Sequence, residues 1–169
     1  MDSVRLQNGT EVGIRAIRPD DGRRLQQAYL RLSHRSQYQR FLASKPRLTP
    51  EDVRYLVEVD GLDHVALVAT PIRDPDVIIG VGRFIRWQDD PTSAEFAIVV
   101  ADEFHRQGLG SELLGRLRDR ARRRGIERFT AMILADNIAV RRLLHRLPGE
   151  LACSQRSGPV EEIEVALAA

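Results

Sequence analysis

Several features that would direct this sequence toward a specialised class of protein are scarce or absent. Cys153 is the single cysteine, so the chain can form no internal disulfide and offers no cysteine cluster for a metal. No apolar run is long enough to span a bilayer. The 26 basic and 24 acidic side chains nearly cancel and leave a net charge of +2. Such a chain has no strong overall field that would attract nucleic acid or a membrane surface.

What remains is the composition of an ordinary globular protein. The 169 residues are 43% apolar and 30% charged, a balance that suits one domain with a hydrophobic core. We therefore expect residues 1–169 to form a single domain. The first ten residues (MDSVRLQNGT) lack the apolar segment of a signal peptide, which predicts a cytoplasmic protein.

The hydrophobic pattern predicts a mixed α/β sheet of about seven strands. Asn8-Gly9, between two alternating runs, predicts a hairpin with a two-residue type I′ turn over residues 3–17. Thr49 and Asp52, on either side of Pro50, have the spacing of a helix-capping box. Three apolar runs separated by turn residues predict an antiparallel meander. The expected helices lie within residues 18–33, 34–43, 49–60, 110–125 and 136–147, and the remaining strands within 63–70, 74–87, 92–100, 127–135 and 149–168.

The stretch HRQGLGSELL, residues 105–114, places two glycines where a strand gives way to a helix. The first N–H groups of a helix have no partner within it, and the helix dipole adds positive potential there. An exposed backbone at such a junction can bind phosphate, with Arg106 close by. The spacing matches neither a P-loop nor a dinucleotide-binding fingerprint. A glycine-rich turn that only allows close helix packing is the alternative.

The wider stretch AEFAIVVADEFHRQGLGSELLGRL resembles motif A of the GNAT superfamily of N-acetyltransferases. Gly108 and Gly110 fit that motif, and His105 stands where glutamine or arginine is commoner. The segments RLSHRSQYQRFL, LTPEDVRYLVEVD and AEFAIVVAD look most like the catalytic domain of bacterial Pat-type protein lysine acetyltransferases. The resemblance implies the GNAT fold, with mostly antiparallel strands, a splayed central pair of strands and four to five helices.

This resemblance implies acetyl-CoA as the co-substrate. Asn137 matches an asparagine that commonly contacts the cofactor arm, although an N-cap of the following helix is an equal explanation. The pantetheine arm would pair with the backbone of Ile98, Val99 and Val100. The diphosphate would lie against the backbone of His105, Arg106, Gln107, Gly108, Leu109, Gly110 and Ser111.

Glu95 is the candidate general base. Strand alternation places it on one face with Ala97 and Val99, and Pat-like enzymes carry a glutamate in this strand. We expect partial desolvation to raise the pKa of this carboxylate and make it a better base near neutral pH. The alternative is a carboxylate at the sheet rim, paired with Arg83 or Arg86.

The resemblance implies no side-chain general acid in this chain. Leu144 occupies the position of the tyrosine that many GNAT enzymes use to protonate the leaving sulfur. The adjacent His145 points about 100° away on a helix. Departure as thiolate, or protonation by water, is therefore expected. An oxyanion would be stabilised by a backbone N–H near Val99 or Val100.

The expected acceptor is a primary amine, with protein lysine ahead of small molecules because of the Pat-like segments. A binding module that senses acyl-CoA without catalysis is the alternative from another class, suggested by the missing tyrosine. The arginines of residues 116–124 are expected to form a solvated helix face rather than a nucleic-acid site. We expect no metal as a partner, because the four histidines lack the spacing of metal ligands. We also expect neither nucleic acid nor a membrane as a partner, because the net charge is small. A homodimer is compatible with the closing strands.

Overall fold

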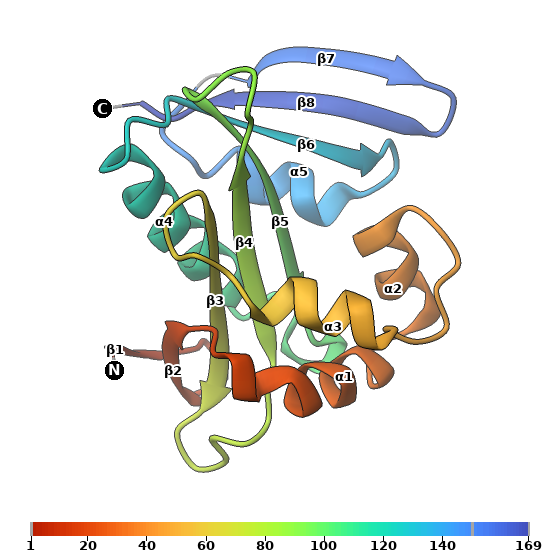
Figure 1. Cartoon of the computed structure of the whole chain (residues 1–169), viewed down its shortest axis with the longest axis vertical. Helices are drawn as coiled ribbons and strands as arrows, with labels where there is room; N and C mark the ends of the chain where they lie inside the picture. Colours follow the sequence, from red (N-terminus) through yellow and green to blue (C-terminus); the bar gives the residue numbers. More distant parts are fainter. Residues whose placement is uncertain (1, 150, 169) are drawn as a thin grey trace.

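The strands of the computed structural model join in a single sheet (Figure 1). The structure describes residues 2–149 and 151–168, with the side chains of residues 152–154 excepted. The spatial order is β1-β2-β3-β4-β5-β6-β8-β7, and among the described residues only β5 and β6 run parallel. The strands are β1 (Asp2–Arg5), β2 (Glu11–Ala16), β3 (His64–Pro71), β4 (Gly80–Arg86), β5 (Ser93–Val100), β6 (Arg128–Leu134), β7 (Leu151–Ser157) and β8 (Val160–Ala166).

The helices follow the expected order along the chain. Thr49 Oγ1 accepts a bond from the N–H of Asp52 (3.1 Å), and the Asp52 carboxylate accepts one from the N–H of Thr49 (2.8 Å), so the capping box is confirmed. The described helices are α1 (Gly22–Leu30), α2 (His34–Phe41), α3 (Pro50–Val57), α4 (Leu109–Arg122) and α5 (Ile138–Leu144), with 3₁₀ turns η1 (Pro19–Asp21) and η2 (Asp102–Phe104).

The mixed α/β sheet and the meander of β3, β4 and β5 are confirmed, and the described strands number eight rather than about seven. The type I′ turn at Asn8-Gly9 was wrong. The Leu6 N–H still donates to the Thr10 carbonyl (2.9 Å), which leaves three residues in the loop, and Gly9 has a positive φ (+87°) whereas Asn8 does not. Asn8 Oδ1 instead accepts a bond from the N–H of Thr10 (3.0 Å), which favours a longer loop.

The sheet is covered on both faces, and strand alternation divides its side chains between two hydrophobic clusters (Figure 1). On one face, α4 packs through Leu113 and Leu117. On the other, α1 and α3 pack through Leu25 and Leu56. Glycines bring α4 close to β4, since a Cβ on Gly82 would lie 2.9 Å from a methyl group of Leu117. The face of β4 and β5 that is turned away from α4 is the one that bears the pocket described below.

Two arginines of α4 are paired with neighbouring acids. Arg116 pairs with Glu112 (2.7 Å) and with Asp2 (3.0 Å), and Arg118 with Asp119 (2.9 Å). This is the arrangement of a solvated helix face. In the described part of the chain, no helix has the length and hydropathy needed to cross a bilayer.

The close approach of α4 to β4 makes Gly82 sensitive to side-chain volume. We expect Gly82→Val to lower the free energy of unfolding by about 2–3 kcal/mol, because the added atoms overlap the buried Leu117. Gly115→Ala is the control: no atom lies within 4 Å of the new Cβ, so this change should stabilise α4 by up to about 1 kcal/mol. Denaturant-induced unfolding measures both. Wild-type stability of Gly82→Val would contradict the packing.

Candidate active site

The first feature of the candidate site is a gap between the central parallel strands. β5 and β6 pair only from Ser93–Arg128 to Glu95–Thr130, whereas β5 remains paired with β4 as far as Val100. The edge of residues 96–100 that would face β6 is therefore open. This is the splayed central pair that the resemblance to the GNAT superfamily implies, and Glu95 lies at the position where the two strands separate.

The second feature is a cradle of free backbone donors at the start of α4, residues 106–111. In the described part of the chain, none of their N–H groups donates a hydrogen bond. The loop turns sharply, with φ of +60° at Arg106 and +92° at Gly108. No atom lies within 4 Å of where a Cβ on Gly108 would be. Unpaired donors and a positive helix end together make a site for an anion such as a diphosphate.

The cradle adjoins the open end of β5. A Cβ on Gly110 would lie 4.0 Å from a methyl group of Val100. His105 differs from the residues that follow it, because its N–H donates to the Asp102 carbonyl (3.2 Å) and its ring Nε2 lies 2.8 Å from the Val100 carbonyl. The His105 backbone donor and the Val100 acceptor are thus already engaged. Ile98 and Val99 lie on the open segment.

The other residues expected to bind the cofactor are held by neighbouring segments. The Gln107 carbonyl accepts a bond from the N–H of Gln7 (3.2 Å), and Ser111 Oγ accepts one from Arg146 (3.2 Å). Leu109 is buried, so only its backbone faces the cradle. Asn137 Oδ1 accepts a hydrogen bond from the N–H of Val140 (3.3 Å). This side chain therefore caps α5, which was the alternative to a contact with the cofactor arm.

Glu95 faces the side of β5 expected from alternation but is exposed. The expected partial desolvation is therefore absent, because neighbouring elements cover Ala94 and Phe96 on the opposite face and leave this side chain open. The rim pairing with Arg83 or Arg86 is also not formed. Arg86 binds Asp63 (2.8 Å), while Arg83 bonds to the Leu56 carbonyl (3.1 Å). Among the described residues, Glu95 has no ion pair.

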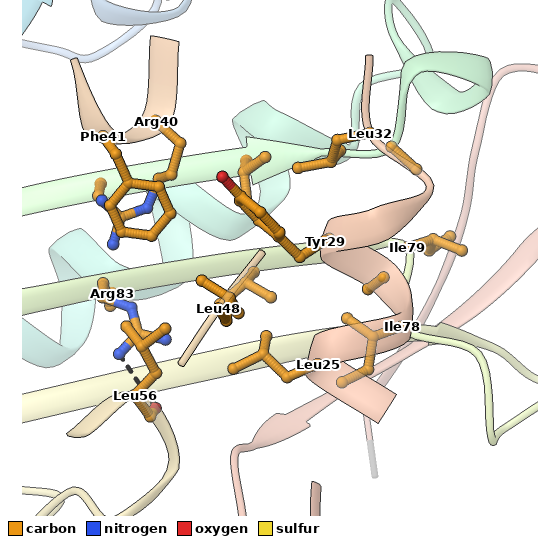
Figure 2. A pocket seen from close by; sticks show the side chains of 16 residues that line it. Leu25, Tyr29, Leu32, Arg40, Phe41, Leu48, Leu56, Ile78, Ile79 and Arg83 are labelled. Atoms are coloured by element: carbon orange, nitrogen blue, oxygen red, sulfur yellow. Dashed lines mark hydrogen bonds between the residues drawn. The ribbon is translucent and has the colours of Figure 1, made fainter. Parts of the chain in front are cut away.

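A pocket lies beside Glu95, on the face of the sheet covered by α1, α2 and α3 (Figure 2). Ala97 and Val99, on the same face of β5 as Glu95, line it. Its space is about 550 Å³, partly open to solvent, and most of the wall is apolar. Arg40 and Arg83 are the charged residues of this lining. The wall also includes Leu25, Ala28, Tyr29, Leu32, Phe41, Leu48, Leu56, Ile78, Ile79 and Val81.

Electrostatics at this pocket are dominated by positive charge. Burial, reinforced by Arg40, lowers the pKa of Arg83 to about 9, so Arg83 is still charged at neutral pH. Burial also lowers the pKa of Arg40 below its ordinary value, against the opposing effect of Glu95. His64 Nε2 lies 3.0 Å from Arg83. Burial, Arg83 and Arg40 lower the pKa of His64 to about 4, so its imidazole is neutral at neutral pH.

A clamp connects the pocket to the cradle. The carboxylate of Asp102, just after β5, accepts bonds from Ser33 N–H (2.8 Å), Ser33 Oγ (3.0 Å) and Ser36 Oγ (2.6 Å). Burial acts to raise the pKa of Asp102, but these hydrogen bonds outweigh burial and lower it below its ordinary value. The clamp fixes the first turn of α2, whose last turn carries Arg40. Sequence analysis missed it, because Asp102 lies 66 residues from Ser36.

Helix α5 contains no tyrosine that could protonate the leaving sulfur. Leu144 is buried in the hydrophobic core, and the adjacent His145 is exposed. Both side chains border a second, smaller hollow with Arg141 and Ile163, away from the residues that line the pocket beside Glu95.

Comparisons with known proteins agree with this geometry. The family model described as "Acetyltransferase (GNAT) family" matches residues 21–147. Acetyltransferase Pat of Mycolicibacterium smegmatis is 34% identical over 144 residues, which cover 85% of this chain and 43% of that protein. This chain therefore spans less than half of that relative's length.

Two solved structures have the same fold. The GNAT domain of S. lividans PAT superposes with a TM-score of 0.86 at 30% identity, covering 98% of this chain and 96% of that one. The yncA protein of Salmonella typhimurium, described with its cofactor acetyl-CoA, superposes with a TM-score of 0.75 over 93% and 94% of the two chains. At 21% identity, the latter likeness shows the fold alone.

The lowered pKa of His64 predicts an acid-sensitive contribution to stability. An unfolded histidine binds a proton below about pH 6.5, whereas folded His64 resists protonation until about pH 4. The unfolded state therefore gains protons first, and stability is lost as the pH falls from about 6.5 to 4. Over this range, we expect the free energy of unfolding of wild type to fall by about 2 kcal/mol more than that of His64→Asn. Solvent screening at the partly exposed His64 keeps the loss below the full value of the pKa shift. Urea unfolding at successive pH values measures the difference, and parallel curves would contradict it.

Proposed function

The chain belongs to the acetyltransferase (GNAT) family, and on that premise we propose that it transfers an acetyl group from acetyl-CoA to a primary amine by direct attack. The observation that carries the proposal is the set of unpaired N–H groups of residues 106–111, next to the open edge of β5. We also propose that residues 1–169 act as one domain, since all the described strands belong to one sheet. We further propose that the protein acts in the cytoplasm and that it can form a homodimer.

The residues present suit coenzyme A. The N–H groups of Arg106, Gln107, Gly108, Leu109, Gly110 and Ser111 would hold the diphosphate. The open backbone groups of Ile98 would pair with the pantetheine amides, whereas those of Val99 are directed to β4. Asn137 would add a contact from the start of α5. His105 contributes by holding Val100 through its ring rather than through its own N–H. The bound molecule supplies an acetyl group activated as a thioester.

Glu95 is proposed to accept the proton of the incoming ammonium. It stands where β5 and β6 separate, on the face of β5 that lines the pocket, and it has no ion pair in the described structure that would occupy its oxygens. Because Glu95 is exposed, it can return the proton to solvent without a further relay. A backbone N–H near Val99 or Val100 would stabilise the oxyanion. With Leu144 buried at the tyrosine position, the sulfur leaves as thiolate or takes a proton from water.

Protein lysine is the acceptor favoured by the Pat-like segments and by the similarity to Acetyltransferase Pat. A small-molecule amine is the second candidate, supported by the largely apolar pocket beside Glu95. A binding module without catalysis would bind coenzyme A but release no thiol from acetyl-CoA when amines are supplied.

The cradle predicts that the diphosphate dominates recognition of coenzyme A. We expect coenzyme A to bind at least about thirtyfold more tightly than pantetheine, which lacks the diphosphate, because hydrogen bonds to charged groups contribute about 1.5–3 kcal/mol each. Isothermal titration calorimetry measures both affinities. 3′-Dephospho-coenzyme A is the control, and it should retain most of the affinity. Equal affinity for pantetheine would show that the free N–H groups have another purpose.

The role of Glu95 predicts a loss of turnover without a loss of cofactor affinity. We expect Glu95→Gln to reduce kcat by about a hundredfold or more, since the amide cannot accept the proton. Coenzyme A affinity should stay within about twofold of wild type. The matched control is Glu162→Gln, an exposed strand glutamate on β8. Thiol release from acetyl-CoA gives kcat, and wild-type turnover in Glu95→Gln would remove this residue from the mechanism.

A further inference from the structure

The pocket beside Glu95 contains two arginines that come from different elements and face the same end of it (Figure 2). Arg83 lies in the middle of β4 and is 4% exposed. Its Nη1 donates to the Leu56 carbonyl (3.1 Å). Arg40 comes from the last turn of α2, with its guanidinium carbon 4.6 Å from the centre of the Phe41 ring. In the described part of the chain, neither arginine has a carboxylate partner within 4.0 Å.

Among the residues that the structure describes, Arg15 and Arg141, two other partly buried arginines, are paired with acids, unlike Arg40 and Arg83. Arg15 makes two bonds to Asp21, each of 2.7 Å, and Arg141 pairs with Glu161. These are the pairings that normally offset the cost of removing a guanidinium from water. Arg40 has neither a hydrogen bond nor an ion pair among the described residues, although it borders an apolar pocket. The Phe41 ring covers the guanidinium plane of Arg40 and leaves its N–H donors available to a ligand.

The charges around the pocket leave an excess of one positive unit at neutral pH. Arg40 and Arg83 contribute two cations, and Glu95 is the carboxylate whose charge acts on Arg40. His64 is neutral at this pH. The Tyr29 hydroxyl donates to the Lys45 carbonyl (2.5 Å), and burial raises its pKa, so it stays neutral as well. Arginine cannot relieve the excess by losing its proton at neutral pH, whereas an anion bound in the pocket would compensate it.

We propose that Arg40 and Arg83 bind a carboxylate of the acyl acceptor while its amine lies at Glu95. The inference rests on the proposed function and names the acceptor class: an amine that also carries a carboxylate and an apolar body. The planar guanidinium groups suit a carboxylate, and Leu25 and Ile78 provide an apolar wall away from the arginines, with Leu48 between them and Arg83 (Figure 2). The carboxylate can belong to an amino acid or to an acidic side chain beside a protein lysine.

The test compares acceptors that differ only in charge. Leucine and leucinamide form one pair, and lysine peptides flanked by aspartate or by asparagine form the other. The measured quantity is the ratio of kcat/KM for the acid to kcat/KM for its amide, in wild type and in Arg40→Gln. In at least one pair, we expect this ratio to fall about tenfold or more in the variant. The change in the ratio cancels the intrinsic reactivity of each amine.

Controls separate a local effect from general damage. Arg35→Gln makes the same charge change on α2 at a side chain that is 71% exposed, and it should leave the ratio as in wild type. Arg40→Lys restores the charge without the planar group and should recover part of the preference. A loss confined to the amino acid pair identifies a small-molecule acceptor, and a loss confined to the peptides identifies an acidic protein segment. An unchanged ratio in both pairs would overturn the inference.

A binding measurement makes the result independent of catalysis. N-Acetylleucine and N-acetylleucinamide, titrated by calorimetry, report on the pocket without acetyl transfer. Tighter binding of the acid that is lost in Arg40→Gln supports the inference even if no acceptor is acetylated, in which case the proposed function fails alone. If acetyl transfer proceeds but neither the kinetics nor the binding depends on Arg40, the proposed function stands and the carboxylate site is rejected.

Discussion

The candidate active site depends on one interruption of hydrogen bonding, the separation of β5 from β6 after Glu95 and Thr130. A strand inside a sheet normally satisfies its backbone groups on both sides, and a strand that loses a neighbour leaves them to other partners. β5 retains β4, so it stays straight and fixed while one edge becomes available. The start of α4 borders this gap, and its free N–H groups continue the polar edge of the strand. An extended ligand with an anionic end would meet both.

The short segment after β5 joins the two halves of the site. Ala101 lines the pocket, Asp102 holds the first turn of α2, and His105 binds the Val100 carbonyl before the chain turns into α4. The acceptor wall and the cofactor cradle are therefore anchored to the same few residues. Three hydrogen bonds to the Asp102 carboxylate hold the first turn of α2 next to this segment.

Local sequence patterns predicted the helices and strands, whereas contacts between distant segments determined the turn geometry, side-chain exposure and the pocket. The capping box at Thr49 and the glycines before α4 are short-range patterns with direct physical causes, so they could be read from the sequence. The hairpin turn was wrong because the Asn8 side chain bonds to the backbone of Thr10. Alternation correctly gave the face of Glu95 but not its exposure, which depends on the elements that cover that face. Arg40 and Arg83 carried no signal, since helices and strands far apart in sequence must meet before their shared pocket exists.

The exposed position of Glu95 changes how the free amine would arise. A carboxylate in water is a weak base, yet an ammonium entering this pocket would lose hydration. This loss disfavours the charged form of the acceptor and leaves the neutral amine unaffected, so the pKa of the acceptor amine itself would fall. The base then needs no strong perturbation of its own; it needs a position beside the amine and a path to solvent. The pocket would perform the deprotonation through its electrostatics, and Glu95 would carry the proton away.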